Sequence, residues 1–441
     1  MKIEKNKVLI NNNIKNFHKT IFIQGDKSLS IRWALLSSIA NGKSKAKNLL
    51  MSEDVLSTLK SIKKLGIKVK IKKDKCEITG RGINGYKFKS GIKLNAGNSG
   101  TFGRLILALL INYDKKIKLV GDKSLSKRDF YRVTNPLSKF GANFITNSGK
   151  LPIVMRGTNK IKPITYVETK GSAQCKSAVM LAALKAYGQT IIKAKKSRNH
   201  TELLFKYLKV PISIYKTKYH DLIKIENIKK IKPLNYKIPC DISSSAFFIA
   251  LTVLSENSKI CIKNININPT RIGIIKILKL MGVKIIYKNI KFYKGEKIAD
   301  LIIESTKIIK SIKCPSYLNA SAIDEFLIIF LIAAKANGVS YFRNLSELNE
   351  KESPRLKWGS KILNLMGIKT KTTNDSIKIY GNPNLIINKK IVIKNYLKDH
   401  RVFMTSVIAA LAFGGKWIIH DKDSIKTSFP SFLDIINSLD N

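Results

Sequence analysis

The chain has 441 residues, which is too long for one ordinary hydrophobic core. With 44% hydrophobic residues, 25 Gly and 11 Pro, its composition is that of a globular protein and excludes disordered and collagen-like classes. Its 81 Lys and Arg against 29 Asp and Glu give a formal net charge of +52. Because the lysines are spread through almost every segment, and Ile and Asn are also abundant, we interpret the charge as compositional drift that attracts small anions, with no nucleic-acid partner.

Membrane and redox signals are absent from the sequence. No apolar run reaches membrane-spanning length, and the longest, near residues 322–334, contains Asp324 and Glu325. The first residues lack the apolar core of a signal peptide. The five cysteines are scattered, odd in number and without metal-binding spacing. We therefore expect a cytoplasmic protein with no membrane partner, no disulfide framework and no metal site.

The segment Gly25–Arg32 predicts a turn that opens a helix through residues 33–40. The free N–H groups of a helix start attract anions, and Lys27, Ser28 and Arg32 add charges and a hydroxyl donor. This pattern favours a phosphate or carboxylate site. Taken alone, it is equally typical of a capped surface helix with ordinary basic side chains.

An internal repeat organises the chain. A polar turn, an apolar helix, a strand and a second helix that ends near Gly recur six times at intervals of about 70–80 residues. The copies begin near Asp26, Ser99, Ser172, Asp241, Asp324 and Asp399. Gly66, Gly141, Gly282 and Gly367 follow second helices and predict left-handed C′ positions.

Six copies predict two domains of three copies each, with pseudo-threefold symmetry. We expect one domain over residues 25–239 and the other over residues 1–24 and 240–441, with hinge crossings near 24 and 240. A hinged pair of domains is typical of closure on a small molecule. The strand-like segment from Lys7 to Asn11 belongs to neither domain by sequence alone.

The second and third copies carry polar motifs at their helix starts. These are Asn95–Arg104, Gly121–Arg128, Gly171–Gln174 and Ser197–Glu202. Each combines small residues, which let a ligand approach the backbone, with Arg or amide donors. His200 is a candidate general base, although a structural or capping role is the more typical interpretation.

The later copies add carboxylates. In the fourth, Asp241 and Asn268–Arg271 have adequate structural explanations as helix starts. In the fifth, Asp324 and Glu325 open an apolar helix, and an N-cap explains only one of them. Lys351 and Arg355, four residues apart, are expected on one helix face beside Glu352. This group suits anion binding with proton transfer, or else an exposed salt-bridged face. The sixth contains Asp399–Arg401 and Lys426–Pro430.

Nine of these motifs, in order over about residues 20–435, resemble the EPSP synthase family. The resemblance implies an α/β (α+β) fold: the two-domain enolpyruvyl transferase fold, each domain with three βαβαββ units. It implies transfer of the enolpyruvyl group of phosphoenolpyruvate to the 5-hydroxyl of shikimate 3-phosphate, with release of phosphate. It further implies that both substrates are small molecules, that no metal or organic cofactor takes part, and that the chain is a monomer.

The resemblance also implies roles for individual residues. As the shikimate 3-phosphate site it gives Lys27, Ser28, Arg32, Ser172, Ala173, Gln174, Ser197, Asp324 and Lys351. As the phosphoenolpyruvate site it gives Lys27, Gly100, Arg128, Gln174, Arg355, Arg401 and Lys426. As catalytic residues it gives Asp324, the base at the attacking hydroxyl, with Glu352 and Lys27. The space beside Gly100 predicts inhibition by glyphosate, a competitor for the phosphoenolpyruvate site.

Several positions depart from the family pattern. Gln24, Leu105 and Pro354 replace residues usual in the family, and Thr427 stands where some members have Lys, which makes Lys426 a weaker candidate ligand. The closest alternative is the sister transferase that acts on UDP-N-acetylglucosamine, which typically carries a Cys in the loop corresponding to Gly121–Arg128. No Cys lies in that loop here. A nucleic-acid-binding protein is a second alternative, weakened by the even spread of Lys.

Overall fold

The computed structural model describes residues 1–439 and divides into two compact units. Unit 1 contains Met1–Gln24, Pro239–Phe292 and the chain from Lys297 onward, and unit 2 contains Gly25–Ile238 and Tyr293–Glu296. The hinge motion expected near residues 24 and 240 stays a prediction.

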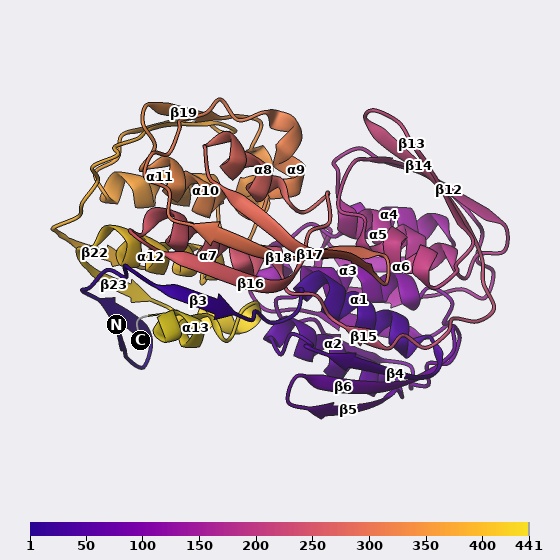
Figure 1. The fold of residues 1–441 in the computed structure, drawn as a ribbon. Coiled ribbons are helices and arrows are strands. Elements are labelled where there is room, and N and C mark those ends of the chain that lie inside the picture. The colour runs from indigo at the N-terminus through magenta and orange to yellow at the C-terminus, as the bar shows by residue number, and fades with distance from the viewer. Residues whose placement is uncertain (440–441) are drawn as a thin grey trace. The chain divides into compact units, whose positions relative to one another are not determined.

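Unit 2 consists of alternating helices and strands (Figure 1). Its helices are α1 (Lys27–Ser38), α2 (Glu53–Lys64), α3 (Gly100–Leu109), α4 (Tyr131–Lys139), α5 (Ala173–Ala183) and α6 (His200–Tyr207). Its strands are β4 (Asn41–Lys47), β5 (Lys68–Lys72), β6 (Lys75–Arg81), β7 (Ile92–Asn95), β8 (Lys116–Val120), β9 (Asn143–Asn147), β10 (Lys150–Arg156), β11 (Thr165–Glu168), β12 (Gln189–Lys195), β13 (Ile212–Lys216), β14 (His220–Glu226) and β15 (Tyr236–Lys237).

Unit 1 has the same alternation. Its helices are α7 (Ile242–Leu254), α8 (Gly273–Leu280), α9 (Asn319–Ala322), α10 (Phe326–Ala333), α11 (Arg355–Leu365), α12 (His400–Phe413) and α13 (Phe432–Leu439). Its strands are β1 (Lys2–Ile3), β2 (Lys7–Ile10), β3 (His18–Ile21), β16 (Lys259–Asn266), β17 (Ile285–Tyr293), β18 (Glu296–Glu304), β19 (Val339–Phe342), β20 (Thr370–Thr372), β21 (Ile377–Tyr380), β22 (Lys390–Ile393) and β23 (Lys416–His420). The turn between β17 and β18, residues 293–296, belongs to unit 2.

The sheets confirm the repeat. Sheets β7-β8-β10-β9 and β11-β12-β14-β13 each arise from one βαβαββ copy, with a parallel first pair and an antiparallel hairpin. In sheet β15-β4-β6-β5 the first strand, β15, comes from the far end of unit 2 and pairs parallel with β4. The first copy is therefore completed by residues that follow the third.

The N-terminal strand that the sequence left unassigned closes the sixth copy. In sheet β1-β2-β23-β22, β2 pairs antiparallel with β23. The next strand, β3, pairs parallel with β16 and opens the fourth copy. Unit 1 is thus a closed set of three copies, in which the chain's beginning supplies strands to its end.

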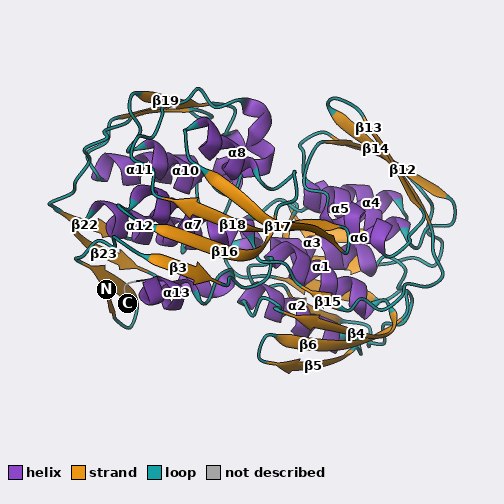
Figure 2. Ribbon diagram, in the orientation of Figure 1, coloured by secondary structure: helices purple, strands orange, loops and turns teal. Residues whose placement is uncertain are grey.

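The first helix of each copy forms the centre of its unit. In unit 1, α7, α10 and α12 pack on one another, and every residue of α7 and α10 is buried. In unit 2, α3 packs against both α1 and α5. Figure 2 shows strands outside these helices in each unit. Helices that are apolar on all sides are stable only when enclosed in this way. No helix among residues 1–439 is long and apolar enough to cross a bilayer.

The predicted glycine helix ends are confirmed. Gly66, Gly141, Gly282 and Gly367 all have φ between +83° and +110°, where a side chain would be strained. In the third copy Lys209 takes this position with φ of +58°. The polar helix starts are confirmed as well: Asp26, Ser99, Ser172, Asp241 and Asp399 each cap a first helix through the side chain.

Candidate active site

The start of α1 confirms the predicted turn and helix. Asp26 accepts a hydrogen bond from the Leu29 N–H at 2.8 Å, which places Lys27 and Ser28 in the first turn. The Lys27 ammonium lies 3.1 Å from a carboxylate oxygen of Asp54, at the start of α2. Lys27 is half-buried, so its charge is partly shielded from water. The helix start and the ammonium together favour an anion at this point.

Arg32 lies on the same helix and is almost fully buried. Its Nε donates to the Thr201 hydroxyl at 2.9 Å and its Nη2 to the Ser177 hydroxyl at 3.1 Å. A third bond, from Nη1 to the Ser28 carbonyl, is 3.2 Å long. The guanidinium is therefore held in one orientation by α1, α5 and α6, and its planar fork suits a phosphate.

The start of α3 brings Gly100 and two arginines together. Arg128 follows the short 3₁₀ turn at Leu125–Lys127 and donates through Nη2 to the Asn98 side chain at 3.2 Å. A Cβ at position 100 would lie 2.9 Å from Nη1 of Arg104 and 3.3 Å from Nη1 of Arg128. Two guanidinium groups thus occupy the space next to this helix start, which makes it strongly attractive to anions.

The start of α5 confirms that Ser172 is an N-cap, since its hydroxyl accepts from the Cys175 N–H at 3.3 Å. Ala173 and Gln174 follow in the first turn, and the Gln174 amide bonds to Arg104 and Thr101 of α3. The buried hydroxyl of Ser197 has no hydrogen-bond partner among the described residues. A buried, unsatisfied hydroxyl is costly without a ligand, which supports Ser197 as a binding residue.

His200 has a structural environment. It is the first residue of α6, it is buried, and its Nδ1 lies 2.6 Å from a carboxylate oxygen of Glu296. Glu296 is fully buried and also belongs to unit 2. These contacts support the structural interpretation of His200 over that of a general base.

Unit 1 assembles a group of opposite charges around Arg355. Its Nε donates to Asp399 at 2.9 Å, its Nη2 to Glu352, and its Nη1 lies 3.5 Å from Asp324. Burial alone would lower the pKa of Arg355, but these three carboxylates together raise it above its ordinary value. Burial opposes ionisation of Asp399, yet the positive charge of Arg355 keeps the pKa of Asp399 below its ordinary value. The guanidinium of Arg355 and the carboxylate of Asp399 therefore remain charged at neutral pH.

One sequence prediction is wrong here: Lys351 and Arg355 do not share a helix face. Lys351 ends the 3₁₀ turn Ser346–Glu350, and α11 begins only at Arg355, after Pro354. Proline disfavours helical geometry in the residue before it, so Ser353 lies outside the helix. Lys351 nevertheless reaches the group, because its ammonium lies 3.9 Å from Asp324.

The starts of α10 and α12 are linked to this group. Arg401, at the second position of α12, donates through Nη1 to the Asp324 carbonyl at 2.7 Å. Glu325 occupies the N-cap position of α10 but makes no capping bond there. It is buried and instead accepts from the hydroxyl of Ser243, which accepts from Arg271. The expectation that an N-cap explains one of the two carboxylates is therefore wrong, because a buried network holds Glu325.

Lys426 lies apart from these contacts. It is part of the 3₁₀ turn Lys422–Thr427, is more than half exposed, and pairs with Asp423 at 3.0 Å. Its assignment to phosphoenolpyruvate stays a prediction.

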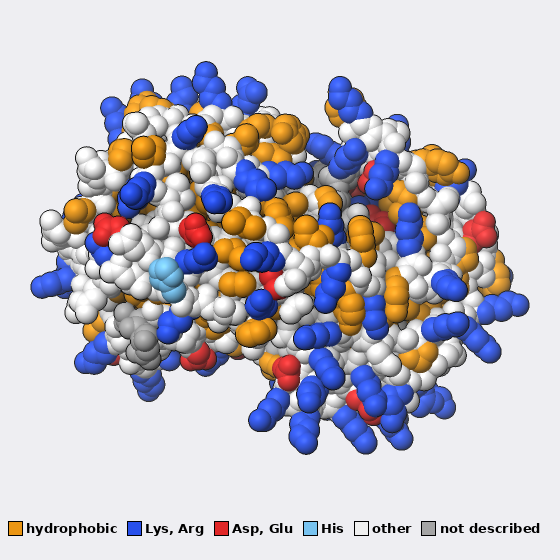
Figure 3. Space-filling model, viewed as in Figure 1, with side chains coloured by type: hydrophobic (Ala, Val, Ile, Leu, Met, Phe, Trp, Pro, Cys, Tyr) orange, Lys and Arg blue, Asp and Glu red, His pale blue; other side chains and the backbone are white. Residues whose placement is uncertain are grey.

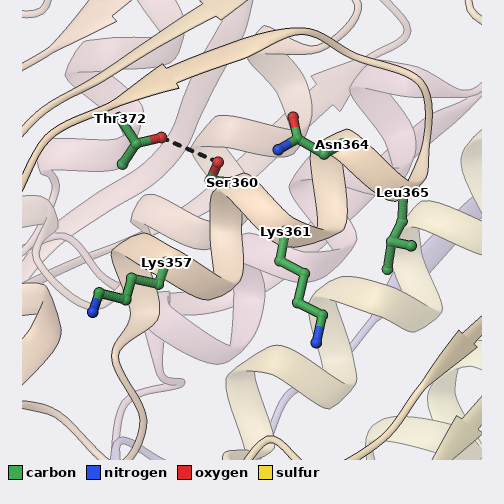
Figure 4. A pocket seen from close by; sticks show the side chains of 6 residues that line it. All are labelled: Lys357, Ser360, Lys361, Asn364, Leu365 and Thr372. Carbon is green, nitrogen blue, oxygen red and sulfur yellow. Dashed lines mark hydrogen bonds between the residues drawn. The ribbon is translucent and has the colours of Figure 1, made fainter.

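A shallow hollow of about 440 Å³ lies on the surface of unit 1 (Figure 4). It is lined by Lys357, Ser360, Lys361, Asn364, Leu365 and Thr372. None of these is a predicted site residue, and their hydroxyl groups bond to one another, as between Thr372 and Ser360 at 3.1 Å. Lys and Arg are also scattered over the whole visible face (Figure 3) without forming a stripe.

No role was predicted from the sequence for the side chains that hold the candidate binding residues in place, although Thr201 and Asp399 lie within predicted motifs. Asp54 contacts Lys27, Thr201 and Ser177 hold Arg32, and Asp399 holds Arg355. The rarity of acidic residues could have pointed to the carboxylates, because the chain has only 29 acidic residues against 81 basic ones. The hydroxyl partners carry no such signal. Among residues 1–439, no group of three or more His, Cys, Asp or Glu could hold a metal ion.

Comparison with solved structures defines the class first. The chain matches the enolpyruvyl transferase NikO from Streptomyces tendae with a TM-score of 0.76 over 98% of this chain and 97% of that one, at 13% identity. This likeness shows an enolpyruvyl transferase fold and no more.

The family follows from closer relatives. The family model of EPSP synthase (3-phosphoshikimate 1-carboxyvinyltransferase) matches residues 11–436. A 3-phosphoshikimate 1-carboxyvinyltransferase of Ruthia magnifica subsp. Calyptogena magnifica is 39% identical over 418 residues, 95% of this chain and 94% of the relative. The EPSP synthase of Acinetobacter baumannii is 32% identical, with a TM-score of 0.87 over 99% of this chain and 98% of that one. The chain belongs to the EPSP synthase family.

Proposed function

We propose that the chain transfers the enolpyruvyl group of phosphoenolpyruvate to the 5-hydroxyl of shikimate 3-phosphate, releasing phosphate. The observation that carries the assignment of roles is the group around Arg355. There Asp324 and Glu352, two carboxylates suited to proton transfer, lie next to cations suited to an anionic substrate. Family membership supports the reaction itself.

In unit 2, the residues at the three helix starts bind shikimate 3-phosphate. Arg32 and Ser28 hold its phosphate, because α1 supplies both a fixed guanidinium and a helix N-terminus. Ser172, Ala173, Gln174 and the unsatisfied hydroxyl of Ser197 contact the rest of the molecule. Lys27 interacts with both substrates, and Gly100, Arg128 and Gln174 with phosphoenolpyruvate.

In unit 1, the residues around Arg355 carry the proton transfers. Asp324 takes the proton of the attacking 5-hydroxyl, and the cations of Lys351 and Arg355 lie 3.9 Å and 3.5 Å from its carboxylate. Lys351 or Glu352 delivers a proton to the methylene carbon of phosphoenolpyruvate. Arg355 and Arg401 neutralise the carboxylate and phosphate of that substrate, and Lys426 adds a cation.

The steps balance as an addition followed by an elimination. Protonation of the methylene makes C2 cationic, and the 5-oxygen attacks it while losing its proton, which gives a tetrahedral adduct. The same region then removes a proton from the new methyl group as the C–O bond to phosphate breaks. Preorganised cations stabilise the negative charge that develops on the departing phosphate, and electrostatic stabilisation of this kind is usually the largest catalytic term. No metal or organic cofactor takes part in these steps.

A phosphate-release assay tests the function. The protein is mixed with phosphoenolpyruvate and shikimate 3-phosphate, and separately with phosphoenolpyruvate and UDP-N-acetylglucosamine. We expect release only in the first mixture. Release only in the second would assign the chain to the sister activity, and release in neither would overturn the enzymatic proposal.

We also propose that the protein is a cytoplasmic monomer with no nucleic-acid partner. Basic side chains occur across the visible face and form no single stripe, which argues against a nucleic-acid groove (Figure 3). Sedimentation at physiological salt, with and without duplex DNA, checks the monomeric state and the absence of DNA binding. The protein is expected to sediment as one species near 49.6 kDa in both samples.

A further inference from the structure

We propose that Arg104 is a positioning residue that sets the orientation of the Gln174 side-chain amide, so that this amide presents an N–H donor to the substrates. The inference rests on the proposed function, which assigns Gln174 to both substrates. Arg104 itself had no role among the predicted site residues.

Both ends of the Gln174 amide are held by α3. Its Oε1 accepts from Nη1 of Arg104 at 2.6 Å, and its Nε2 donates to the hydroxyl of Thr101 at 2.9 Å. Thr101 and Arg104 are three residues apart on α3 and therefore lie on the same helix face. The amide of α5 is thus clamped by two side chains of one neighbouring helix.

Only Arg104 can decide which end of the amide faces which way. A guanidinium has donors and no acceptor, so the amide oxygen must face it. A threonine hydroxyl both donates and accepts, so Thr101 would tolerate either orientation. With the oxygen bound to Arg104, the second N–H of Nε2 meets no acceptor among residues 1–439 and remains available to a ligand.

Arg104 is itself fixed in place. Its Nη2 donates to the Asp129 carbonyl at 3.1 Å, and its guanidinium carbon lies 5.0 Å from the centre of the Phe130 ring. Burial, with Arg128 and Arg132 nearby, lowers the pKa of Arg104 to about 10, which still leaves it charged at neutral pH. A rigid, charged donor can hold the amide oxygen against rotation.

The orientation matters because both proposed substrates are anionic. An amide N–H attracts a phosphate, carboxylate or ether oxygen, whereas an amide oxygen in the same place repels it. Loss of Arg104 would let the amide rotate, and misplacement of one binding group by about 1 Å can cost about 100-fold in rate.

A double-mutant cycle tests the proposal by turnover. We expect Arg104→Met to lower kcat/KM for phosphoenolpyruvate about 10- to 100-fold in the wild-type background and less than about 3-fold in the Gln174→Ala background. Equal losses in both backgrounds would overturn it. Arg132→Met is the matched control, because it removes a neighbouring positive charge of α4 without touching Gln174. If Arg104→Met does not fold, Arg104→Gln replaces it in the same cycle, because a glutamine amide can face Gln174 with either its oxygen or its N–H and so fixes no orientation.

A second readout does not depend on turnover. In protein with ¹⁵N-labelled glutamine side chains, the Gln174 NH₂ signals, assigned through Gln174→Ala, should shift in Arg104→Met and stay unchanged in Arg132→Met. Unchanged signals in Arg104→Met would overturn the positioning role even in an active enzyme. If the wild type releases no phosphate but the Gln174 signals still shift in Arg104→Met, only the proposed function is overturned, and the positioning role stands.

Discussion

At the scale of single residues, the candidate site depends on a few charges whose partners are specific. In a chain with 81 basic side chains, one more Lys or Arg means little by itself. Lys27, Arg32 and Arg355 differ from the exposed majority of basic residues because each is at least partly buried and contacts a defined partner. Desolvated charges interact more strongly with a ligand than exposed ones.

Lys27 gives the first prediction. Lys27→Ala removes a cation assigned to both substrates, and we expect kcat/KM to fall at least about 100-fold. Steady-state phosphate release measures the loss, and a thermal melt confirms that the variant is folded. Lys60→Ala, on the exposed side of α2, is the control and should keep full activity. Near-wild-type kcat in Lys27→Ala would refute the assignment.

Gly100 gives the second prediction. In Gly100→Ala the new methyl group would meet the guanidinium groups of Arg104 and Arg128, and we expect a KM for phosphoenolpyruvate about 10-fold higher, with weaker inhibition by glyphosate. Gly103→Ala on the same helix is a matched control. Its Cβ would lie 3.5 Å from its nearest neighbours, Ala96 and Phe130, which is ordinary contact. Equal effects of the two substitutions would contradict the proposed crowding.

At the scale of elements, equivalent copies of the repeat use the same device at their helix ends. Lys185 follows α5 and donates to the carbonyl of Leu109, the last residue of α3, at 2.5 Å. Lys335 follows α10 and donates to the carbonyl of Leu254, the last residue of α7, at 3.2 Å. In each unit, a lysine that follows the first helix of one copy thus donates to the last carbonyl of the first helix in the preceding copy. A cation is favoured at such a helix C-terminus.

Lys185 predicts a pH dependence of stability. Burial lowers its pKa to about 7 in the folded protein, whereas an unfolded lysine titrates near its ordinary value of 10.5. Between these values the unfolded chain binds the extra proton, so stability should rise with pH by up to about 1.4 kcal/mol per unit. Urea unfolding from pH 7 to 9.5 should show this rise in the wild type and a flatter profile in Lys185→Met. Parallel profiles would show that Lys185 does not cause the rise.

At the scale of the whole molecule, neither unit is a single stretch of chain. Unit 1 joins both ends of the sequence through β2 and β23, and unit 2 includes residues 293–296 from the tip of the hairpin β17–β18. In unit 2 that tip is well anchored. Glu296 pairs with His200, and the ring of Tyr293 stacks on Tyr236 with centroids 5.6 Å apart. Unit 2 therefore depends on residues distant in sequence.

Glu296 gives the fourth prediction. Glu296→Ala removes the buried carboxylate that lies 2.6 Å from Nδ1 of His200, and loss of one partner of a buried hydrogen bond costs about 1–3 kcal/mol. Hydrogen exchange should therefore be faster in α6, which begins at His200. Glu304→Ala is the control, because Glu304 is partly exposed and pairs with Lys259 at 2.8 Å, an arrangement worth about 1 kcal/mol or less. Equal exchange rates in the two variants would argue against an anchoring role.

The sequence by itself determined the capped helix starts of five copies, the glycine ends of four second helices, the repeat and the family. These depend on local chemistry: a cap such as Asp26 bonds three residues away, and Gly66 ends a helix through its own φ. The prediction that Lys351 and Arg355 share a helix face was wrong, because Pro354 separates Lys351 from the helix of Arg355. It also could not assign β2, whose partner β23 lies more than 400 residues later in the chain.

Only the tertiary structure decided which side chains hold the site residues. Thr201 bonds Arg32 across 169 residues, and Gln174 meets Arg104 across 70. No spacing rule relates such positions, because they become neighbours only when α1, α3, α5 and α6 pack within unit 2. Hydroxyl and amide partners are also common residue types whose roles depend on what they face. The sequence therefore named the groups expected to bind and react, and the packing of the helices determined how each of them is held.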